Sequence, residues 1–127
     1  MSDRASVLDA SAVLALLHEE PGADEVEAAL DGALMSCVNL SEVLQKAEQH
    51  GAETEGLEYD LEALGVTFRP FDVPAARTTA AAWKAGSGQS LGDRACLALT
   101  AEVDGVALTA EGRWAQVTEG ITVRVIR

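Results

Sequence analysis

The feature that most constrains the fold is an alternation of short apolar runs with longer segments of helical character. The runs with strand character cover residues 6–8, 33–38, 66–71, 106–109 and 123–126. This alternation is typical of β-α units, in which parallel strands form a sheet and the helices between them cover its faces. The sequence therefore predicts an α/β fold with a mostly parallel sheet of about five short strands flanked by helices.

The segments between the strands are predicted helices, and several of their ends are marked by glycine or proline. Gly51 and Gly65 each follow a predicted helix, and Pro74 suits the first residue of a helix. Asn39 is expected to open the helix after the second strand. The predicted helices cover residues 11–18, 23–30, 39–50, 53–64, 74–85, 91–103 and 111–117.

Length and composition favour one soluble domain over residues 1–127. Hydrophobic residues make up 48% of the 127 positions, enough for a real core. No apolar run reaches the roughly 18 residues that cross a bilayer, and the start is not a basic signal segment. Cys37 and Cys96 lack a zinc-site pattern and are expected to be reduced, packed thiols of a cytoplasmic protein.

The net charge of −12 argues against broad, non-specific binding to nucleic acid, which relies on Lys and Arg. A polyanionic substrate would have to be met by local contacts. Many of the acidic residues lie between Glu48 and Glu62, where no Lys or Arg occurs. This run is interpreted as a solvated helix face, with a docking surface for a basic partner as the alternative.

Four acids are predicted to lie at one edge of the sheet. Asp9 follows the first strand and Glu42 lies in the first helical turn after the second. Asp93 opens a helix, and Glu111 follows the strand over 106–109. In a parallel sheet these strand ends and helix starts gather along the edge where ligands bind.

Helix capping is the simpler explanation for each acid taken alone. The segments 39–42 and 90–93 both have the capping-box spacing of a polar residue and an acid three positions later. Asp9 and Glu111 could likewise cap a helix or interact with its dipole. Capping does not explain, however, why both of them end apolar strands at the same predicted edge.

Carboxylates held close together repel one another unless a proton or a cation offsets their charge. A set of oxygen ligands without His or Cys favours Mg²⁺ or Mn²⁺ over Zn²⁺. Such ions activate water and stabilise a leaving oxygen, which is the chemistry of phosphodiester hydrolysis.

Four motifs, in order, resemble the PIN-domain ribonucleases, and more narrowly the VapC-like toxins of toxin-antitoxin pairs. They are Val7-Leu8-Asp9-Ala10-Ser11-Ala12, Asn39-Leu40-Ser41-Glu42-Val43, Ser90-Leu91-Gly92-Asp93-Arg94-Ala95, and Leu108-Thr109-Ala110-Glu111 with Trp114. The resemblance spans essentially the whole chain. It implies a PIN-like α/β/α sandwich.

The resemblance also implies roles for individual residues. Asp9, Glu42 and Asp93 would be the central metal ligands, and Ser11 would orient Asp9 or a metal-bound water. Glu111 departs from the family pattern, which often has Asp at this position. The longer side chain leaves open whether Glu111 ligates directly, acts through water or weakens a second metal position.

The expected activity is Mg²⁺- or Mn²⁺-dependent endonucleolytic cleavage of single-stranded or looped RNA by an activated water. The resemblance further implies a cognate antitoxin that inserts Arg and apolar side chains near the acidic groove. Homodimers are common among these relatives, and no membrane association is expected.

Other functions are less consistent with the sequence. No Ser/His/Asp arrangement is evident, and His18 and His50 are both expected to close helices. Receiver domains and haloacid-dehalogenase-type phosphatases resemble this chain in the first Asp, but Lys46 and Lys84 lie in predicted helices rather than at a late strand end. A non-catalytic protein-binding module with a degenerate acidic site remains the alternative.

Residues that would grip a substrate are not determined by the sequence. Arg94 and Arg113 adjoin two of the acids, as phosphate contacts or as surface charges. Trp83 and Trp114 would either stack on bases or pack in the interior. The loop over 86–90 would either flex over substrate or only connect two helices.

Overall fold

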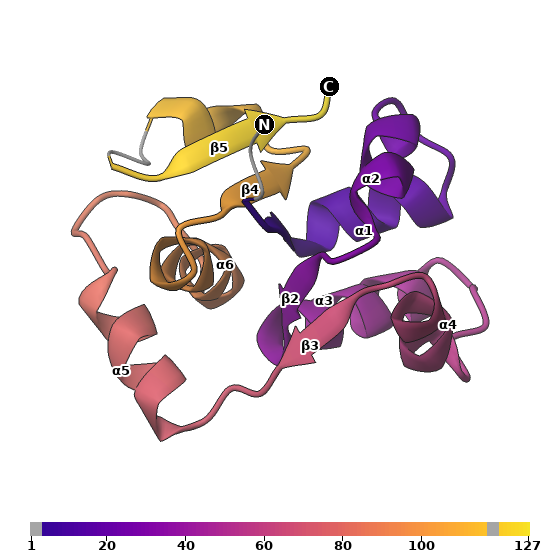
Figure 1. The fold of residues 1–127 in the computed structure, drawn as a ribbon, viewed down its shortest axis with the longest axis horizontal. Coiled ribbons are helices and arrows are strands. Elements are labelled where there is room, and N and C mark those ends of the chain that lie inside the picture. Colours follow the sequence, from indigo (N-terminus) through magenta and orange to yellow (C-terminus); the bar gives the residue numbers. More distant parts are fainter. Residues whose placement is uncertain (1–3, 117–119) are drawn as a thin grey trace.

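The computed structural model describes residues 4–116 and 120–127. Its centre is a sheet in which all strand pairs are parallel, in the order β3-β2-β1-β4-β5. In Figure 1 the sheet extends from β5, near the top of the view, down to β3. Their bounds are Ser6–Leu8 for β1, Leu34–Ser36 for β2, Thr67–Arg69 for β3, Val106–Thr109 for β4 and Thr122–Val125 for β5.

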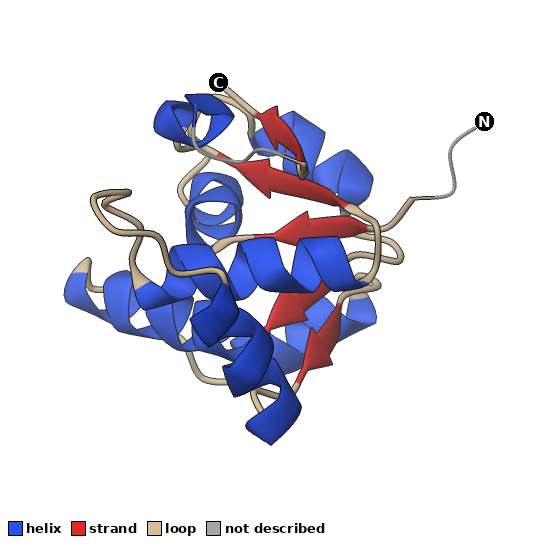
Figure 2. Ribbon diagram, turned by 90° about the vertical axis from the view of Figure 1, so that its left-hand side faces the viewer, coloured by secondary structure: helices blue, strands red, loops and turns tan. Residues whose placement is uncertain are grey.

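Helices cover both faces of the sheet, as Figures 1 and 2 show, so the predicted α/β/α architecture is confirmed. One face carries α1 to α4 and the other carries α5, α6 and the short 3-10 helix η1. The helices are α1 Ala10–Leu17, α2 Ala23–Ala29, α3 Cys37–Gln49, α4 Leu57–Ala63, α5 Val73–Ala81, α6 Leu91–Glu102 and η1 Gly112–Gln116.

The alternation of side chains along the strands divides the core between the two faces. In β1, Leu8 packs under α1 while its neighbour Val7 packs under α6. In β4, Leu108 and Ala107 divide in the same way. Trp114 from η1 is fully buried in the α6 layer. The central strands are thus apolar on both faces, as expected for a sheet covered by helices on both sides.

The start of α3 differs from the prediction. The second strand ends at Ser36 instead of continuing to Val38, and the helix begins at Cys37 instead of Asn39. Ser36 is the N-cap, because its hydroxyl accepts a hydrogen bond from the Val38 amide at 3.2 Å. The predicted capping box over 39–42 is therefore wrong, and Glu42 lies in the second turn of α3.

Two other helices are shorter than predicted. Helix α4 begins at Leu57, not at residue 53, because Gly56 precedes it in a left-handed conformation with φ +80°. Helix α5 ends at Ala81, where the amides of Ala82 and Trp83 donate to carbonyls three residues back. The predicted helix over 111–117 is the 3-10 helix η1, and Val117 lies outside the described residues.

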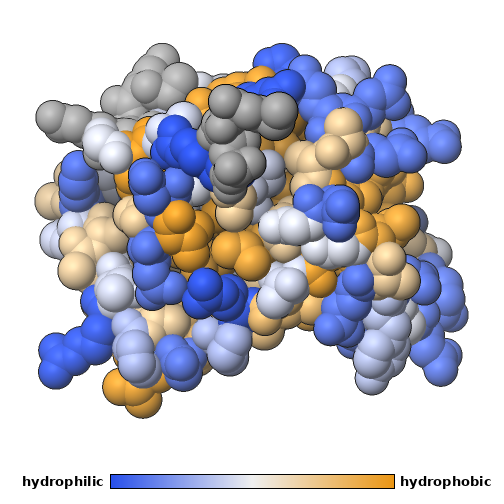
Figure 3. All heavy atoms as spheres, in the orientation of Figure 1, coloured by the Kyte–Doolittle hydropathy of each residue, from blue (hydrophilic) through white to orange (hydrophobic). Residues whose placement is uncertain are grey.

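The sheet order determines where a ligand site can form. From β1 the chain adds β2 and β3 on one side, then returns to add β4 and β5 on the other. The connections that leave β1 and β4 therefore run to opposite sides of the sheet, and the adjacent carboxyl ends of these two strands form a topological switch point, the usual ligand position in such folds. Figure 3 shows hydrophobic side chains between hydrophilic ones on one face of the molecule.

In the described part of the chain, none of the helices is long and apolar enough to cross a membrane.

Candidate active site

A small acidic cavity lies at this switch point. Its volume is about 30 Å³, enough for an ordered water or a small ion. The structure brings all five predicted site residues to this cavity. The lining residues are Asp9, Ala10, Ser11, Asn39, Glu42, Lys46, Asp93 and Glu111.

Asp9 follows β1 and is hydrogen-bonded to the end of β4. It is the N-cap of α1, and its Oδ1 accepts from the Ala12 amide at 2.8 Å. The hydroxyl of Thr109, at the end of β4, donates to Asp9 Oδ2 at 2.6 Å. The side chain is only 4% exposed. Asp9 is therefore a helix cap, as the simpler explanation predicted, and it also lines the cavity.

Burial raises the pKa of Asp9 to about 6, from an ordinary value of 3.8. Hydrogen bonds from Thr109, Ala12 and Ser11 lower the pKa in part, and the charge of Asp93 raises it further. Asp9 therefore still ionises below neutral pH, but its buried charge costs more than that of an exposed carboxylate, and a bound cation would offset this cost. A carboxylate in this state is a natural partner for a metal ion.

Ser11 orients Asp9. Its hydroxyl lies 2.8 Å and 2.9 Å from the two carboxylate oxygens of Asp9, to which it donates. The oxygen of Ser11 also accepts a hydrogen bond from the Ala110 amide at 2.8 Å. Ser11 therefore joins the start of α1 to the segment after β4. Of the two roles implied for this residue, the contacts favour orientation of Asp9.

Glu42 faces the cavity from the second turn of α3 and is partly buried. Burial raises its pKa above the ordinary value, and the charge of Asp93 acts in the same direction. The hydrogen bond from Asn39 and the charge of Lys46 oppose this rise. Among the described residues, Lys46 is the one cationic side chain that lines the cavity. The local charge is strongly negative as a result.

Asp93 has two roles in the structure. It forms the predicted capping box of α6, in which its Oδ2 accepts from the Ser90 amide at 3.0 Å and its amide donates to the Ser90 hydroxyl at 3.1 Å. The guanidinium of Arg113 lies 3.5 Å from the same Oδ2. The side chain of Asp93 is 15% exposed and lines the cavity. Capping therefore leaves Asp93 available to a ligand.

Glu111 is the most open of the four acids. Its side chain is 47% exposed, and its nearest cation is Arg113, at 3.9 Å. Its backbone amide donates to the Thr109 hydroxyl at 3.0 Å, which fixes the chain directly after β4. Glu111 thus lines the cavity with a more exposed carboxylate than Asp9 or Asp93.

The four acids do not form a closed ligand shell. In the described part of the chain, no three His, Cys, Asp or Glu side chains converge closely enough to hold one ion directly. Their oxygen chemistry nevertheless fits Mg²⁺, which keeps several of its waters and often uses only one or two carboxylates. The other acids would then contact the ion through water.

Three residues that contribute to the site were not singled out from the sequence for that purpose. Thr109 and Asn39 are buried donors to Asp9 and Glu42, respectively. Gly92 leaves the space that the Glu42 carboxylate occupies. The sequence signal for Thr109 was its place at the end of a predicted strand, two residues before Glu111.

The predicted substrate-binding residues have different positions. Arg94 donates to the Thr79 carbonyl at 3.4 Å and does not line the cavity, whereas Arg113 is exposed beside Asp93. Trp114 is in the core, which leaves Trp83, at 61% exposure, as the accessible tryptophan.

The remaining polar candidates have structural positions. His18 and His50 are C-caps of α1 and α3, as predicted. Cys96 is buried and free, and burial raises its pKa. The run over 48–62 is mostly exposed to solvent, as predicted, although only part of it is helical.

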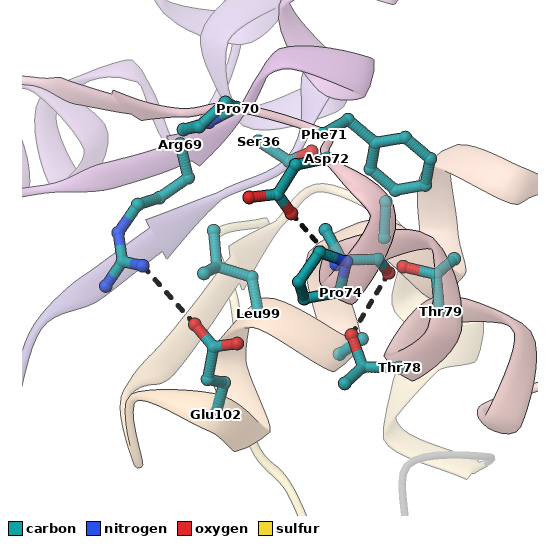
Figure 4. A pocket seen from close by; sticks show the side chains of 13 residues that line it. Ser36, Arg69, Pro70, Phe71, Asp72, Pro74, Thr78, Thr79, Leu99 and Glu102 are labelled. Carbon is teal, nitrogen blue, oxygen red and sulfur yellow. Dashed lines mark hydrogen bonds and ion pairs between the residues drawn. The ribbon is translucent and has the colours of Figure 1, made fainter.

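A larger cavity of about 140 Å³ lies between the ends of β2 and β3 and helices α5 and α6 (Figure 4). It shares no lining residue with the acidic cavity. Its charged side chains are already engaged, since Arg69 pairs with Glu102 at 3.3 Å and Asp72 accepts from the Ala75 amide. This cavity is lined by two acids, Asp72 and Glu102, and lacks the cluster of four that lines the acidic cavity.

Solved structures with the same fold include chains of toxin-antitoxin complexes. One is a toxin-antitoxin complex from Klebsiella pneumoniae, with a TM-score of 0.74 and 17% identity over 97% of this chain and 98% of the other. Another is DNA-bound VapBC from Salmonella typhimurium, with a TM-score of 0.71 and 15% identity over 98% and 99% of the two chains. At these identities the likeness is one of fold.

No curated protein shows a significant sequence match to the chain. A family model does match: the PIN domain model aligns with residues 6–120, nearly the whole chain and all four acids. The resemblance in the motifs, the sheet topology and this match agree, and the chain belongs to the PIN-domain family.

Proposed function

We propose that this chain is a divalent-metal-dependent endoribonuclease, and that it is the toxin of a toxin-antitoxin pair in the cytoplasm. The observation that carries the proposal is the cavity at the switch point, lined by Asp9, Glu42, Asp93 and Glu111. Membership of a family of nucleases supports this chemistry. The toxin-antitoxin complexes with the same fold support the biological role.

In this proposal Asp9, Glu42 and Asp93 hold Mg²⁺ or Mn²⁺, with Glu111 contributing through its more exposed carboxylate. The ion would supply an activated water and offset charge on the phosphate. The chain itself fixes Asp9 through Ser11 and Thr109, which holds the carboxylate in one orientation before substrate arrives.

Arg113 is the candidate phosphate contact. Its guanidinium lies beside Asp93 and Glu111 and is 59% exposed, so it can turn toward an RNA strand at the mouth of the cavity. With a net charge of −12, the chain has little general attraction for RNA. Cleavage would therefore be confined to RNA shapes, single-stranded or looped, that bring a phosphate to the mouth of the cavity.

The proposed partner is a cognate antitoxin with basic and apolar side chains. The acidic cavity and the negative charge of the chain are complementary to Arg-containing segments. The chain is also proposed to form a homodimer, because homodimers are common among the proteins it resembles.

The direct test is RNA cleavage by the purified chain with Mg²⁺, Mn²⁺ or chelator. We expect metal-dependent cleavage that Asp9→Asn reduces at least 100-fold and that Glu111→Gln reduces less. Asp72→Asn is the matched control, because Asp72 caps α5 as Asp9 caps α1 but lies outside the acidic cavity. Cleavage that survives chelation, or that Asp9→Asn leaves unchanged, would contradict the proposal.

A non-catalytic binding module is the second candidate. It is favoured by one observation, that no three ligands converge in the described part of the chain. A folded protein that neither binds Mn²⁺ nor cleaves a broad pool of cellular RNA would support this alternative.

A further inference from the structure

The carboxylate of Glu42 is held by two residues that belong to different helices. Asn39 lies one turn before it on α3, and the side-chain amide of Asn39 donates to Glu42 Oε1 at 3.1 Å. The same amide nitrogen donates to the Gly92 carbonyl on α6, also at 3.1 Å. Asn39 is only 1% exposed, so both hydrogen bonds are shielded from water.

The two partners of Asn39 fix the orientation of its amide. A carboxylate and a carbonyl are both acceptors, so the nitrogen must face them and the oxygen must point away. In this orientation Asn39 Oδ1 is buried, with no hydrogen-bond partner among the described residues. An unpaired buried acceptor costs free energy. Asn39 thus donates to Glu42 although its own Oδ1 is left without a hydrogen bond. Such a local cost is typical of functional sites.

Gly92 contributes space. It is the second residue of α6, and its φ lies outside the left-handed region, so the backbone does not require glycine. A Cβ at this position would overlap the carboxylate of Glu42, from Oε1 to Oε2. The glycine is therefore explained by the close approach of the Glu42 carboxylate to α6.

We propose that Asn39 and Gly92 are positioning residues that hold the Glu42 carboxylate at the acidic cavity, beside Asp93. This inference rests on the proposed function, in which Glu42 is a metal ligand. The hydrogen bonds of Asn39 pull the carboxylate toward α6, and the absence of a side chain at position 92 lets it approach. The geometry of the ligand therefore depends on two residues that do not themselves bind the ion.

The first test is the Mn²⁺ affinity of Gly92→Ala, measured by calorimetry. The added methyl displaces only the end of a flexible side chain and improves helix propensity, so we expect a folded protein with an unchanged or higher Tm. Its Mn²⁺ affinity is expected to fall about tenfold or more, the usual effect of disturbing the support of a metal ligand. Gly112→Ala is the matched control, because a Cβ at that position meets nothing within 4 Å.

Asn39→Leu is the second variant, because it removes the donor while keeping the same number and branching of side-chain heavy atoms. It is expected to weaken Mn²⁺ binding by a similar factor, whatever its effect on Tm. A merely structural role would lower Tm and leave the affinity unchanged. Wild-type affinity in both folded variants would overturn the inference.

A metal-free measurement separates this inference from the proposed function. Asn39 is the only asparagine of the chain, so labelling with ¹⁵N-asparagine gives one side-chain amide signal pair in NMR spectra. Both hydrogen bonds predict slow exchange of this amide with water and a changed shift in Gly92→Ala. Rapid exchange would overturn the positioning role. Slow exchange in a protein that binds no Mn²⁺ would support the positioning and contradict the proposed function.

Discussion

Thr109 and Asp9 are 100 residues apart in the chain, yet the threonine hydroxyl donates to the aspartate Oδ2 at 2.6 Å. Both side chains are buried, at the adjacent ends of β4 and β1. A short hydrogen bond to a buried carboxylate stabilises the ionised form and fixes the position of its oxygens. The site thus depends on how these two strands pair.

Thr109→Val tests this relationship. Loss of the donor is expected to raise the pKa of Asp9 further, to destabilise the fold by about 1–3 kcal/mol and to weaken Mn²⁺ binding about tenfold. Thr100→Val is the matched control: that buried hydroxyl donates to the Cys96 carbonyl within α6, away from the cavity. Thermal unfolding and calorimetry measure both variants. Equal Mn²⁺ affinities in the two variants would contradict the role assigned to Thr109.

The raised pKa of Asp9 predicts an unusual pH dependence of stability. The folded state binds the proton of Asp9 more tightly than the unfolded chain, whose pKa is near 3.8. The contribution of Asp9 to the free energy of unfolding is therefore fully present below about pH 4. It declines by up to about 3 kcal/mol as the pH rises to about 6, and is constant above that.

Asp9→Asn isolates this contribution in metal-free protein. The variant is expected to be more stable than the wild type at pH 7, with a difference that shrinks as the pH falls from 6 toward 4. Chemical denaturation at several pH values gives the comparison. A difference that does not change with pH would show that burial does not shift the pKa of Asp9.

The two roles of Asp93 are separable by substitution. Asp93→Asn keeps an acceptor for the Ser90 amide, so the free energy of unfolding is expected to fall by less than about 1 kcal/mol, while RNA cleavage falls at least 100-fold. Ser90→Ala is expected to do the reverse. Its free energy of unfolding falls by about 1 kcal/mol, while its RNA cleavage stays within about threefold of the wild type. Denaturation curves and cleavage rates of the two variants measure this. Retained cleavage in Asp93→Asn would assign Asp93 to capping alone.

The sequence was sufficient to predict the sheet and the acids because both depend on local patterns. Strands β1 and β4 are the apolar runs that were expected, with the same ends. Parallel pairing then brings Asp9 and Glu111 to one edge whatever the details of packing. The Ser90–Asp93 capping box was predictable for the same reason, since it depends on spacing alone.

The start of α3 was not predictable from local patterns. Ser36 and Asn39 are both good N-cap residues, and only the length of β2 decides between them. Because the helix starts at Cys37, Asn39 lies inside the helix, where its side chain is free to reach Glu42. Gly92 was equally hidden, because its role depends on a side chain 50 positions away that α3 presents to α6.

The most direct test of the central claim is a crystal structure of the wild-type chain grown with Mn²⁺, with anomalous diffraction locating the ion. We expect one anomalous peak in the acidic cavity, within about 2.5 Å of a carboxylate oxygen of Asp9, Glu42 or Asp93. An empty cavity at millimolar Mn²⁺, or a peak only on the exposed acidic surface over 48–62, would contradict it.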